Sequence, residues 1–481
     1  MSSIHFFCNL AEATTPLPHF WEHTVGSDHA PIALRADWQN QLRRCHEDLG
    51  FQYVRFHGLL SDDMGTLVKN NRLVYSFFNA DQVFDFLLSI GMKPFVELSF
   101  MPIALASGGR TVFNYEANIT PPKHYKQWAT LIRQLTSHLV QRYGLEEVRK
   151  WFFEVWNEPN LKSFWSGTQK DYFRLYRYTA EAIKKTDALL RVGGPATARS
   201  EWIEDFVDYC ERNKVPADFI STHQYPTDGH ESEAETELQL FKSQRGIMRE
   251  VAQNTRRYAR GRPVYYTEWN SSSNQRDPLH DESYAAAFAV STVMEARGLV
   301  DGYSFWTFSD IFEEEYFPSV PFHGGFGLLT LHGIPKPTYR GFALLHQLGT
   351  EQFIVDGLHE TVDCFVVGKD STITVLLTNH ATPGHSIESN QVKIRLDKAP
   401  QPVAAYVQRI DADHANPKQL WEEMGQPEYL SHKDVERLEE TSLLMRENQP
   451  FSYEEGVLAL KTNLPPHGVA SITIEFQTRR G

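Results

Sequence analysis

Residues 151–160 read Trp-Phe-Phe-Glu-Val-Trp-Asn-Glu-Pro-Asn, and this stretch decides the fold expected for the 481-residue chain. An apolar run here gives way to an amide, a carboxylate and a proline. Proline has no N–H for a sheet ladder, so the strand ends before it. Glu158 is therefore expected at the C-terminal end of a buried strand, the end at which parallel α/β barrels carry their chemistry.

A second stretch repeats this pattern. Residues 263–270 read Pro-Val-Tyr-Tyr-Thr-Glu-Trp-Asn, so Glu268 also ends an apolar run. For one such carboxylate alone, an ion pair with a nearby arginine is an equally good interpretation, but no packing rule places a charge twice at this depth. Glycoside hydrolysis needs two carboxylates, one as acid/base and one as nucleophile or base. The pair therefore indicates that chemistry.

The wider pattern up to about residue 350 is that of repeated βα units, because short β-branched or aromatic runs alternate with amphipathic stretches. The expected strands cover residues 4–9, 53–57, 94–98, 151–156, 191–193, 219–223, 264–267 and 303–307. The expected helices lie near 35–48, 80–90, 122–143, 169–188, 200–213, 234–257, 282–297 and 339–348. Eight of each predict an α/β fold built on a closed (β/α)8 TIM barrel over residues 1–350.

The rest of the chain has a different character. Runs such as 361–367, 372–377 and 469–475 have strand length and tend to alternate apolar with polar residues. That alternation is typical of antiparallel sheets, so residues 351–481 are expected to form an appended C-terminal β-sandwich. An acidic, helix-like segment at 433–440 interrupts the strands, and the sequence suggests no role for it.

Composition limits the classes of partner. The formal charge of -14 and the pI near 5.8 argue against a nucleic-acid or anionic-membrane surface. The four cysteines are far apart and lack metal-site spacing, so neither a disulfide framework nor a zinc site is expected. The first residues lack the basic region of a signal peptide, and no run of about 18 apolar residues occurs. We expect a cytoplasmic protein without membrane association.

Four motifs together resemble family 39 of the clan A glycoside hydrolases. They are the stretches around Glu158 and Glu268, Ser-Thr-His-Gln-Tyr-Pro at 221–226 and Phe-Trp-Thr-Phe-Ser-Asp at 305–310. The motifs follow the family's order, and the resemblance covers nearly the whole chain. Its best-known members are β-D-xylosidases and α-L-iduronidases. The resemblance implies a retaining reaction with Glu158 as acid/base and Glu268 as nucleophile, their carboxyl groups roughly 5–5.5 Å apart.

Further residues are expected to bind the sugar. By the resemblance, Asn157 donates a hydrogen bond to the sugar 2-hydroxyl, although an Asn at this position could also cap the loop backbone. Tyr225 could hold the nucleophile in line, and His223 could bind a hydroxyl or the acid/base. The alternative for both residues is a satisfied group of the core.

Three more candidates come from other strand ends. His57 is expected to line the same pocket, whereas Arg55 fits a buried ion-pair partner better than a sugar ligand. Trp306 offers a flat face to a pyranose ring or packs as core. In the acidic run after the eighth strand, Glu314 best matches the family's sugar-binding glutamate, with Glu313 possible; a solvated charge run is the alternative.

The expected function is therefore a retaining exo-acting β-D-xylosidase that hydrolyses xylo-oligosaccharides from the non-reducing end. It requires no metal and no cofactor, and its partner is a small oligosaccharide; a homo-oligomer is possible. The alternatives are an α-L-iduronidase-like or other clan A activity, including arabinosidase side activity, and a non-catalytic carbohydrate-binding barrel. An iduronate carboxylate would need a cation, and few flank the motifs apart from Lys162 and Arg276.

Overall fold

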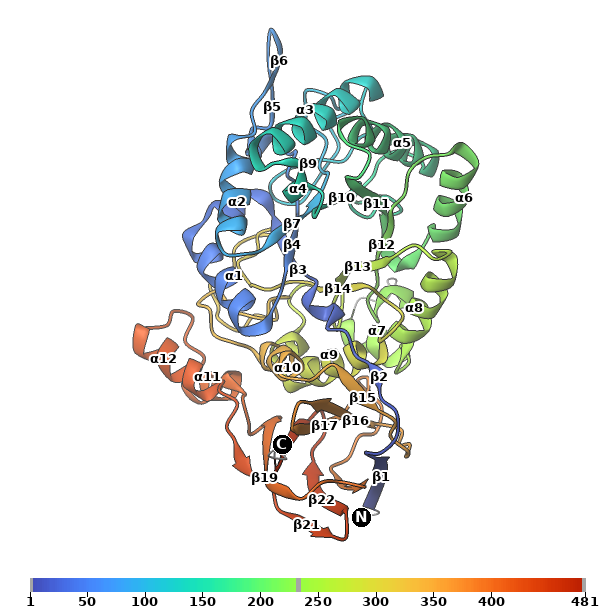
Figure 1. Cartoon of the computed structure of the whole chain (residues 1–481). Helices are drawn as coiled ribbons and strands as arrows, with labels where there is room; N and C mark the ends of the chain where they lie inside the picture. The colour runs from blue at the N-terminus through green and yellow to red at the C-terminus, as the bar shows by residue number, and fades with distance from the viewer. Residues whose placement is uncertain (1–2, 231–234, 478–481) are drawn as a thin grey trace.

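A computed structural model describes residues 3–230 and 235–477, and eight parallel strands in it close into a barrel in chain order (Figure 1). The strands are β3 (Thr24–His29), β4 (Tyr53–His57), β7 (Lys93–Glu97), β10 (Phe152–Glu154), β11 (Arg191–Thr197), β12 (Phe219–His223), β13 (Val264–Trp269) and β14 (Gly302–Phe305). The expected (β/α)8 barrel is confirmed.

Helices surround this barrel. They are α1 (Ala36–Leu49), α2 (Phe78–Ser89), α3 (Tyr125–Tyr143), α4 (Leu145–Val148), α5 (Gln169–Thr186), α6 (Ile203–Asn213), α7 (Thr236–Lys242), α8 (Ile247–Tyr258), α9 (Ser283–Glu295) and α10 (Pro337–His346). Single 3-10 turns, η1 to η6, cover Phe20–Glu22, Ala30–Leu34, Asp62–Met64, Ala198–Ser200, Asp228–His230 and Pro278–Asp281. Two hairpins, β5 (Leu67–Asn70) with β6 (Arg72–Tyr75) and β8 (Thr111–Val112) with β9 (Ala117–Asn118), extend the loops. Each helix in the described ranges is too short or too polar to cross a bilayer.

The first barrel strand corrects the sequence analysis. Residues 4–9 were expected in the barrel, but they form β1 (Ser3–Asn9), which pairs in parallel with a strand of the C-terminal region. The barrel begins instead with β3, whose sequence Thr-Val-Gly-Ser-Asp-His has no apolar run that could reveal it. The count of eight strands was right because one wrong strand replaced one missed strand. Glu158 and Glu268 consequently still belong to the fourth and seventh strands.

The barrel interior is layered because residues two apart on a strand face the same side. At the N-terminal end Tyr53, Phe95, Phe152, Phe219 and Tyr265 pack into one aromatic cluster. Two residues further along the same strands, this layer gives way to polar and charged groups. Aromatic side chains thus fill the base of the barrel, and polar side chains lie towards its mouth.

The C-terminal region contains two sheets that share a hydrophobic core. One has the order β1, β18 (Asn390–Asp397), β22 (Val457–Leu464), β21 (Phe451–Glu454). The other has the order β2 (Thr15–Pro16), β15 (Glu351–Phe353), β16 (Val362–Lys369), β17 (Thr372–Asn379), β23 (Val469–Phe476), β19 (Pro402–Ile410), β20 (Glu447–Asn448). The two sheets form the expected β-sandwich. Residue 350 lies between α10 and β15, but the range 1–350 also contains β1 and β2, which belong to these sheets.

Helix α9 joins the two regions. Every residue from Tyr284 to Met294 is buried, because the helix packs against α10 of the barrel on one side and against β17 and β23 on the other. A helix that is apolar all round is expected in such a position between two packed layers. The barrel and the sandwich therefore share an extensive apolar contact.

A helical excursion from the sandwich contacts the long loop after β14. Helices α11 (Pro417–Glu423) and α12 (His432–Thr441) lie beside the barrel at the left of Figure 1. Their Trp421 and Leu438 pack with Phe322 and Ile334 of the loop. The acidic segment at 433–440, to which the sequence analysis assigned no role, thus helps to fix the loop that carries Glu313 and Glu314.

Candidate active site

Two carboxylates meet at the barrel mouth. Glu158 lies just beyond β10, and Glu268 lies on β13. One oxygen of each carboxylate and a ring nitrogen of His223 all lie within 4.8 Å of one another. Trp156 and Glu158 have left-handed φ angles of 74° and 43°, so the backbone on both sides of Asn157 is strained. Strain of this kind is common where a backbone aims side chains into a functional site.

Glu268 is held by donors on both of its oxygens. Arg55 Nη1 contacts Oε1 at 2.6 Å, and the Tyr225 hydroxyl donates to Oε2 at 3.1 Å. His57 Nε2 lies 3.7 Å from Oε1. These contacts stabilise the ionised carboxylate and fix its rotamer.

Arg55 is fully buried and is shared between three carboxylates. Besides Glu268 it contacts Glu154 at 2.6 Å and Glu97 at 2.8 Å, and it donates to the Asn157 side-chain oxygen at 2.9 Å. A buried guanidinium suits this task because its fork of five donors is rigid and stays charged. Arg55 is accordingly an ion-pair partner, as the sequence suggested.

The surroundings separate the two facing glutamates electrostatically. Burial, with Glu268 and Asp228 nearby, raises the pKa of Glu158 well above its ordinary value. Burial also raises the pKa of Glu268, but there Arg55 and His57 oppose the shift. Two carboxyl groups with such different neighbours are suited to opposite protonation states.

His223 contacts Glu158 through one nitrogen only. Its Nδ1 lies 3.0 Å from Glu158 Oε1. Burial and the charge of Arg55 lower the pKa of His223 well below its ordinary value, so the ring is neutral. Its buried Nε2 has no hydrogen-bond partner within the described part of the chain.

The other predicted sugar ligands surround the same site. Glu314 Oε1 lies 3.6 Å from His57 Nε2, and burial together with Asp28 raises the pKa of Glu314 well above its ordinary value. Trp306 is buried, with its ring 4.9 Å from that of His57, and it clusters with Tyr225. All eight predicted residues lie in one connected set: Glu158, Glu268, His57, Asn157, His223, Tyr225, Trp306 and Glu314.

The loop with Glu314 is fixed from several sides. The backbone N–H of Glu313 donates to Asp28 Oδ2 at 2.7 Å, and the Glu314 carbonyl accepts from the Asn114 N–H at 2.7 Å. The buried Lys336 also pairs with Asp281 at 2.6 Å and Asp310 at 2.7 Å. These contacts hold the backbone on both sides of Glu314 in place.

Sequence reasoning missed several polar residues at this mouth. His29 lies 3.2 Å from Glu313 and stacks on Tyr115 at 3.8 Å. Although burial opposes it, Asp28 and Asp63 raise the pKa of His29 to about 9. Both Asp28 and His29 end the strand that the sequence did not reveal, so their position could not be inferred. Glu97, by contrast, lies one residue before the end of the expected strand 94–98 and ends the observed β7, so that signal was available.

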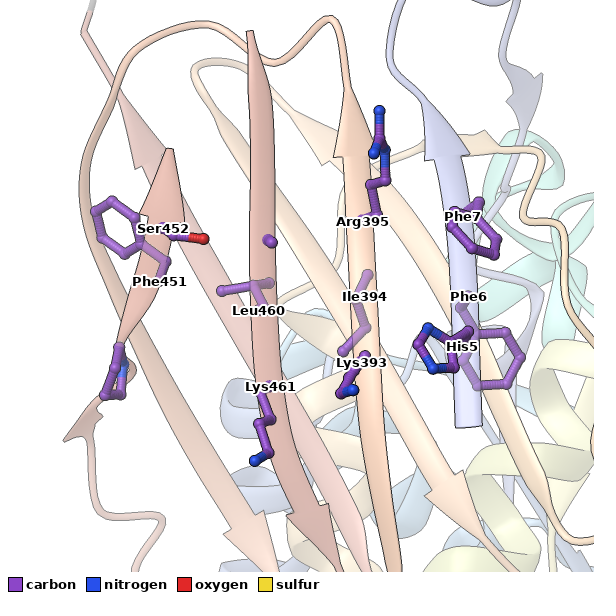
Figure 2. A pocket seen from close by; sticks show the side chains of 12 residues that line it. His5, Phe6, Phe7, Lys393, Ile394, Arg395, Phe451, Ser452, Leu460 and Lys461 are labelled. Carbon is purple, nitrogen blue, oxygen red and sulfur yellow. The ribbon is translucent and has the colours of Figure 1, made fainter. Parts of the chain in front are cut away.

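A hollow of about 500 Å³ lies elsewhere, on the outer face of the sheet that contains β1 (Figure 2). Phe7, Arg395 and Lys461 are among the side chains around it, and none of its lining residues carries a carboxylate. Because general acid/base cleavage needs carboxyl groups, this surface is not the catalytic site.

A TIM barrel with facing carboxylates at the ends of its fourth and seventh strands is the framework of a glycoside hydrolase. The model of "Glycosyl hydrolases family 39" matches residues 7–456, and the chain belongs to this family. A β-xylosidase of Caldicellulosiruptor saccharolyticus is 49% identical, with 95% of each chain covered. A β-xylosidase of Geobacillus stearothermophilus is 37% identical, covering 95% of this chain and 92% of that protein. The structure of a family 39 β-xylosidase from Caulobacter crescentus superposes with a TM-score of 0.82 at 32% identity, covering 98% and 99% of the two chains.

Proposed function

We propose that the protein is a retaining, exo-acting β-D-xylosidase that releases xylose from the non-reducing end of short xylo-oligosaccharides. The observation that carries this proposal is the close approach of Glu158 and Glu268, with oxygens within 4.8 Å. Retaining enzymes hold the two carboxyl groups about 5–5.5 Å apart, whereas inverting enzymes need roughly 6.5–9.5 Å to admit a water. The two β-xylosidase relatives support xylose as the sugar.

Glu268 is the proposed nucleophile. Its bonds from Arg55 and Tyr225 favour the ionised form and point one oxygen at a fixed position. Attack on the anomeric carbon forms a glycosyl-enzyme bond and expels the leaving oxygen. Water then attacks the same carbon, so the released sugar keeps its β configuration.

Glu158 is the proposed acid/base. Its raised pKa favours the protonated carboxyl group that a general acid needs. That proton passes to the leaving oxygen in the first step. In the second step the ionised Glu158 takes a proton from the attacking water. Glu268 loses its negative charge in the step in which Glu158 becomes ionised, and the second step reverses this, so the two neighbouring carboxyl groups need not be charged together.

The remaining residues are proposed to bind the sugar. Because Asn157 accepts from Arg55 through its oxygen, its side-chain Nδ2 remains the donor for the sugar 2-hydroxyl. The unpartnered Nε2 of His223 and the carboxyl group of Glu314 offer further hydroxyl contacts. Trp306 provides the aromatic wall.

A neutral glycone fits the site better than iduronate. The two cations that the sequence offered are engaged elsewhere: Lys162 donates to the Gly167 carbonyl at 2.7 Å, and Arg276 stacks on Tyr316 at 3.6 Å. Arg55 already faces three carboxylates. A further anionic group would add repulsion to a cluster of glutamates.

The test is hydrolysis of a panel of nitrophenyl glycosides, with proton NMR of the first sugar anomer released. The panel contains β-xyloside, α-arabinoside, β-glucoside and α-iduronide. We expect the β-xyloside to be cleaved fastest and β-xylose to appear first. Early α-xylose would mean an inverting enzyme and would remove the nucleophile role from Glu268.

Glu158→Ala tests the acid role separately. The first step on a dinitrophenyl xyloside should stay fast, because this leaving group departs without a proton. The rate of the first step on an alkyl xyloside should fall by about 10²–10⁴-fold, because its poor leaving group needs the proton. In wild type, kcat/KM should fall as pH rises through the raised pKa of Glu158, and this alkaline limb should vanish in the variant. Glu315→Ala, on the same mouth but 59% exposed in its side chain, is the matched control. Equal loss on both leaving groups contradicts the role.

The proposed compartment is the cytoplasm, where short imported oligosaccharides from xylan are the available substrates. All four cysteines are free and buried, which suits a reducing environment. Assembly into a homo-oligomer stays a prediction that size-exclusion chromatography with light scattering can test.

A further inference from the structure

Three potential metal ligands meet at the base of the barrel, remote from the catalytic pair in the sequence and in the fold. His19 precedes η1, Glu22 ends η1, and His346 ends α10. Both imidazoles turn Nδ1 to the same oxygen, Glu22 Oε1, at 2.6 Å for His19 and 2.9 Å for His346. One ligand atom from each of the three lies within 4.8 Å of the others.

The ring of His19 is held as metal-binding imidazoles usually are. Its Nε2 lies 3.2 Å from the Gly349 carbonyl oxygen. Donation to this carbonyl places the proton on Nε2 and leaves the lone pair of Nδ1 facing the carboxylate. A backbone carbonyl behind the second nitrogen is the usual way in which proteins orient an imidazole towards a metal. A lone pair and a carboxylate oxygen at 2.6 Å hold a proton between them in the metal-free protein, and a metal ion would bind by displacing this proton.

The cluster is also open to an ion from solvent. The side chains of His19, Glu22 and His346 are 17%, 14% and 39% exposed. Gly50 lies beside them with a φ of +77°, and a side chain there would approach His346 and Glu22 Oε2 to less than 3 Å. The glycine therefore leaves room for the three side chains to close around an ion.

We propose that His19, Glu22 and His346 bind a borderline divalent transition-metal ion of the Zn²⁺ class, with water completing the coordination. Two imidazoles and one carboxylate are a ligand set typical of zinc. Mg²⁺ and Ca²⁺ prefer oxygen ligands and should not compete. This inference is independent of the proposed xylosidase activity.

The place of the site assigns it a structural role. The chain passes between barrel and sandwich twice, through β2 before η1 and through residues 347–350 after α10. These passages lie side by side, since Leu17 donates to the Thr350 carbonyl at 2.8 Å and β2 pairs with β15 (Figure 1). An ion bound to His19, Glu22 and His346 would join both passages to the barrel base. It would therefore stabilise the joint between the two regions.

The test is isothermal titration of the metal-stripped full-length protein with Zn²⁺, with Ni²⁺ and Mg²⁺ as comparisons. We expect one Zn²⁺ per chain, no heat with Mg²⁺, and a rise in the midpoint of thermal unfolding on addition of Zn²⁺. Both effects should disappear in His346→Ala and in the milder Glu22→Gln, whereas His332→Ala, which removes an exposed histidine outside the cluster, should retain both.

Glu158, His223 and Glu268 could also attract a metal, so Glu268→Gln is titrated as well. Zn²⁺ binding that persists in His346→Ala but is lost in Glu268→Gln would assign the ion to the catalytic pair and overturn the proposal. Absence of Zn²⁺ binding to the wild-type protein would overturn it too. Cleavage of an aryl xyloside should be the same in the metal-stripped and Zn²⁺-loaded protein at matched pH.

Discussion

The two ends of the barrel are built from the same strands but hold opposite kinds of side chain. Phe95 and Phe152 pack at the base, and Glu97 and Glu154, two residues further along each strand, surround Arg55 towards the mouth. The base is a cluster of rings with dense contacts, whereas the mouth crowds several carboxyl groups around one guanidinium. The difference shows that stability and chemistry are separated along the barrel axis, a few ångströms apart on each strand.

The largest effect should come from Glu268→Ala. We expect kcat/KM on an aryl β-xyloside to fall by at least ~10⁴-fold, because the glycosyl-enzyme bond can no longer form. Azide should restore turnover and give the α-xylosyl azide, which NMR identifies. The midpoint of thermal unfolding should stay the same or rise, because a crowded carboxylate is removed. A large loss of stability would mean that this end of the barrel also supports the fold.

Arg55→Met tests the guanidinium that three carboxylates of the mouth share. It leaves Glu97, Glu154 and Glu268 without their shared partner, and breaking such a buried pair costs about 3–5 kcal/mol of unfolding free energy. The acid limb of kcat/KM should also move to higher pH, because Arg55 opposes the rise in the pKa of Glu268. Urea denaturation and a pH–rate profile measure the two effects.

Arg191→Met is the matched control at the base. Arg191 stacks on Phe152 at 3.7 Å and contacts no carboxylate of the mouth. The free energy of unfolding should fall by about 1 kcal/mol, and the pH profile of kcat/KM should not change. If both arginine variants lose the same stability, the contrast between the two ends does not hold.

The two ends should respond oppositely to pH. Burial and Arg191 lower the pKa of His23, at the base, to about 3. Below about pH 6.5, His23 is protonated in the unfolded chain but stays neutral in the folded protein. The free energy of unfolding therefore falls by up to about 1.4 kcal/mol per pH unit as the pH drops from 6.5 towards 3. His23→Phe should remove this slope in denaturation curves at pH 6, 5 and 4.

Glu158 gives the opposite sign. Its pKa is raised in the folded protein, so its favourable contribution is complete below the unfolded value and is lost as pH rises through the raised value. Glu158→Gln should flatten the loss of stability as pH rises from the unfolded Glu pKa, about 4.3, through the raised value, and should leave stability below that unfolded pKa unchanged. A His23→Phe variant with the full acid slope would place the acid sensitivity elsewhere.

The smallest effect on activity should come from Phe152→Leu. The Phe152 ring is stacked on that of Phe95, with ring centres 4.9 Å apart. The smaller leucine should lower the free energy of unfolding by about 1–2 kcal/mol. The value of kcat/KM should remain within about twofold of wild type, because no catalytic contact changes. A loss of activity larger than the loss of stability would show that the rings also position the mouth.

The sequence predicted the barrel well where strands have apolar runs. Two strands, 53–57 and 219–223, were placed to the residue. Strand β3 was missed because its sequence, Thr-Val-Gly-Ser-Asp-His, is mostly polar. All six residues are nevertheless buried in the fold, and the sequence alone does not reveal this. Strand β1 was misplaced because its alternation fits either architecture, and only its pairing with β18 decides between them.

The site was predictable in part for a similar reason. Glu158 and Glu268 follow strands with clear apolar runs. Because a barrel brings the C-terminal ends of its strands to one mouth, the proximity of the two glutamates could be predicted. The contacts of Arg55 and the meeting of His19 with His346 depend on side chains brought together from distant parts of the chain. Such meetings leave no local pattern in a single sequence.

Strand β1 has a consequence for synthesis on the ribosome. It emerges long before its partner β18, which begins at residue 390 and at about 5–20 residues per second follows roughly 20–80 s later. Throughout this time Phe6 and Cys8, which belong to the sandwich core, have no partner sheet. We expect a nascent chain stalled near residue 380 to be cut by protease close to its N-terminus while the barrel resists. Strand β1 is thus translated early but secured late.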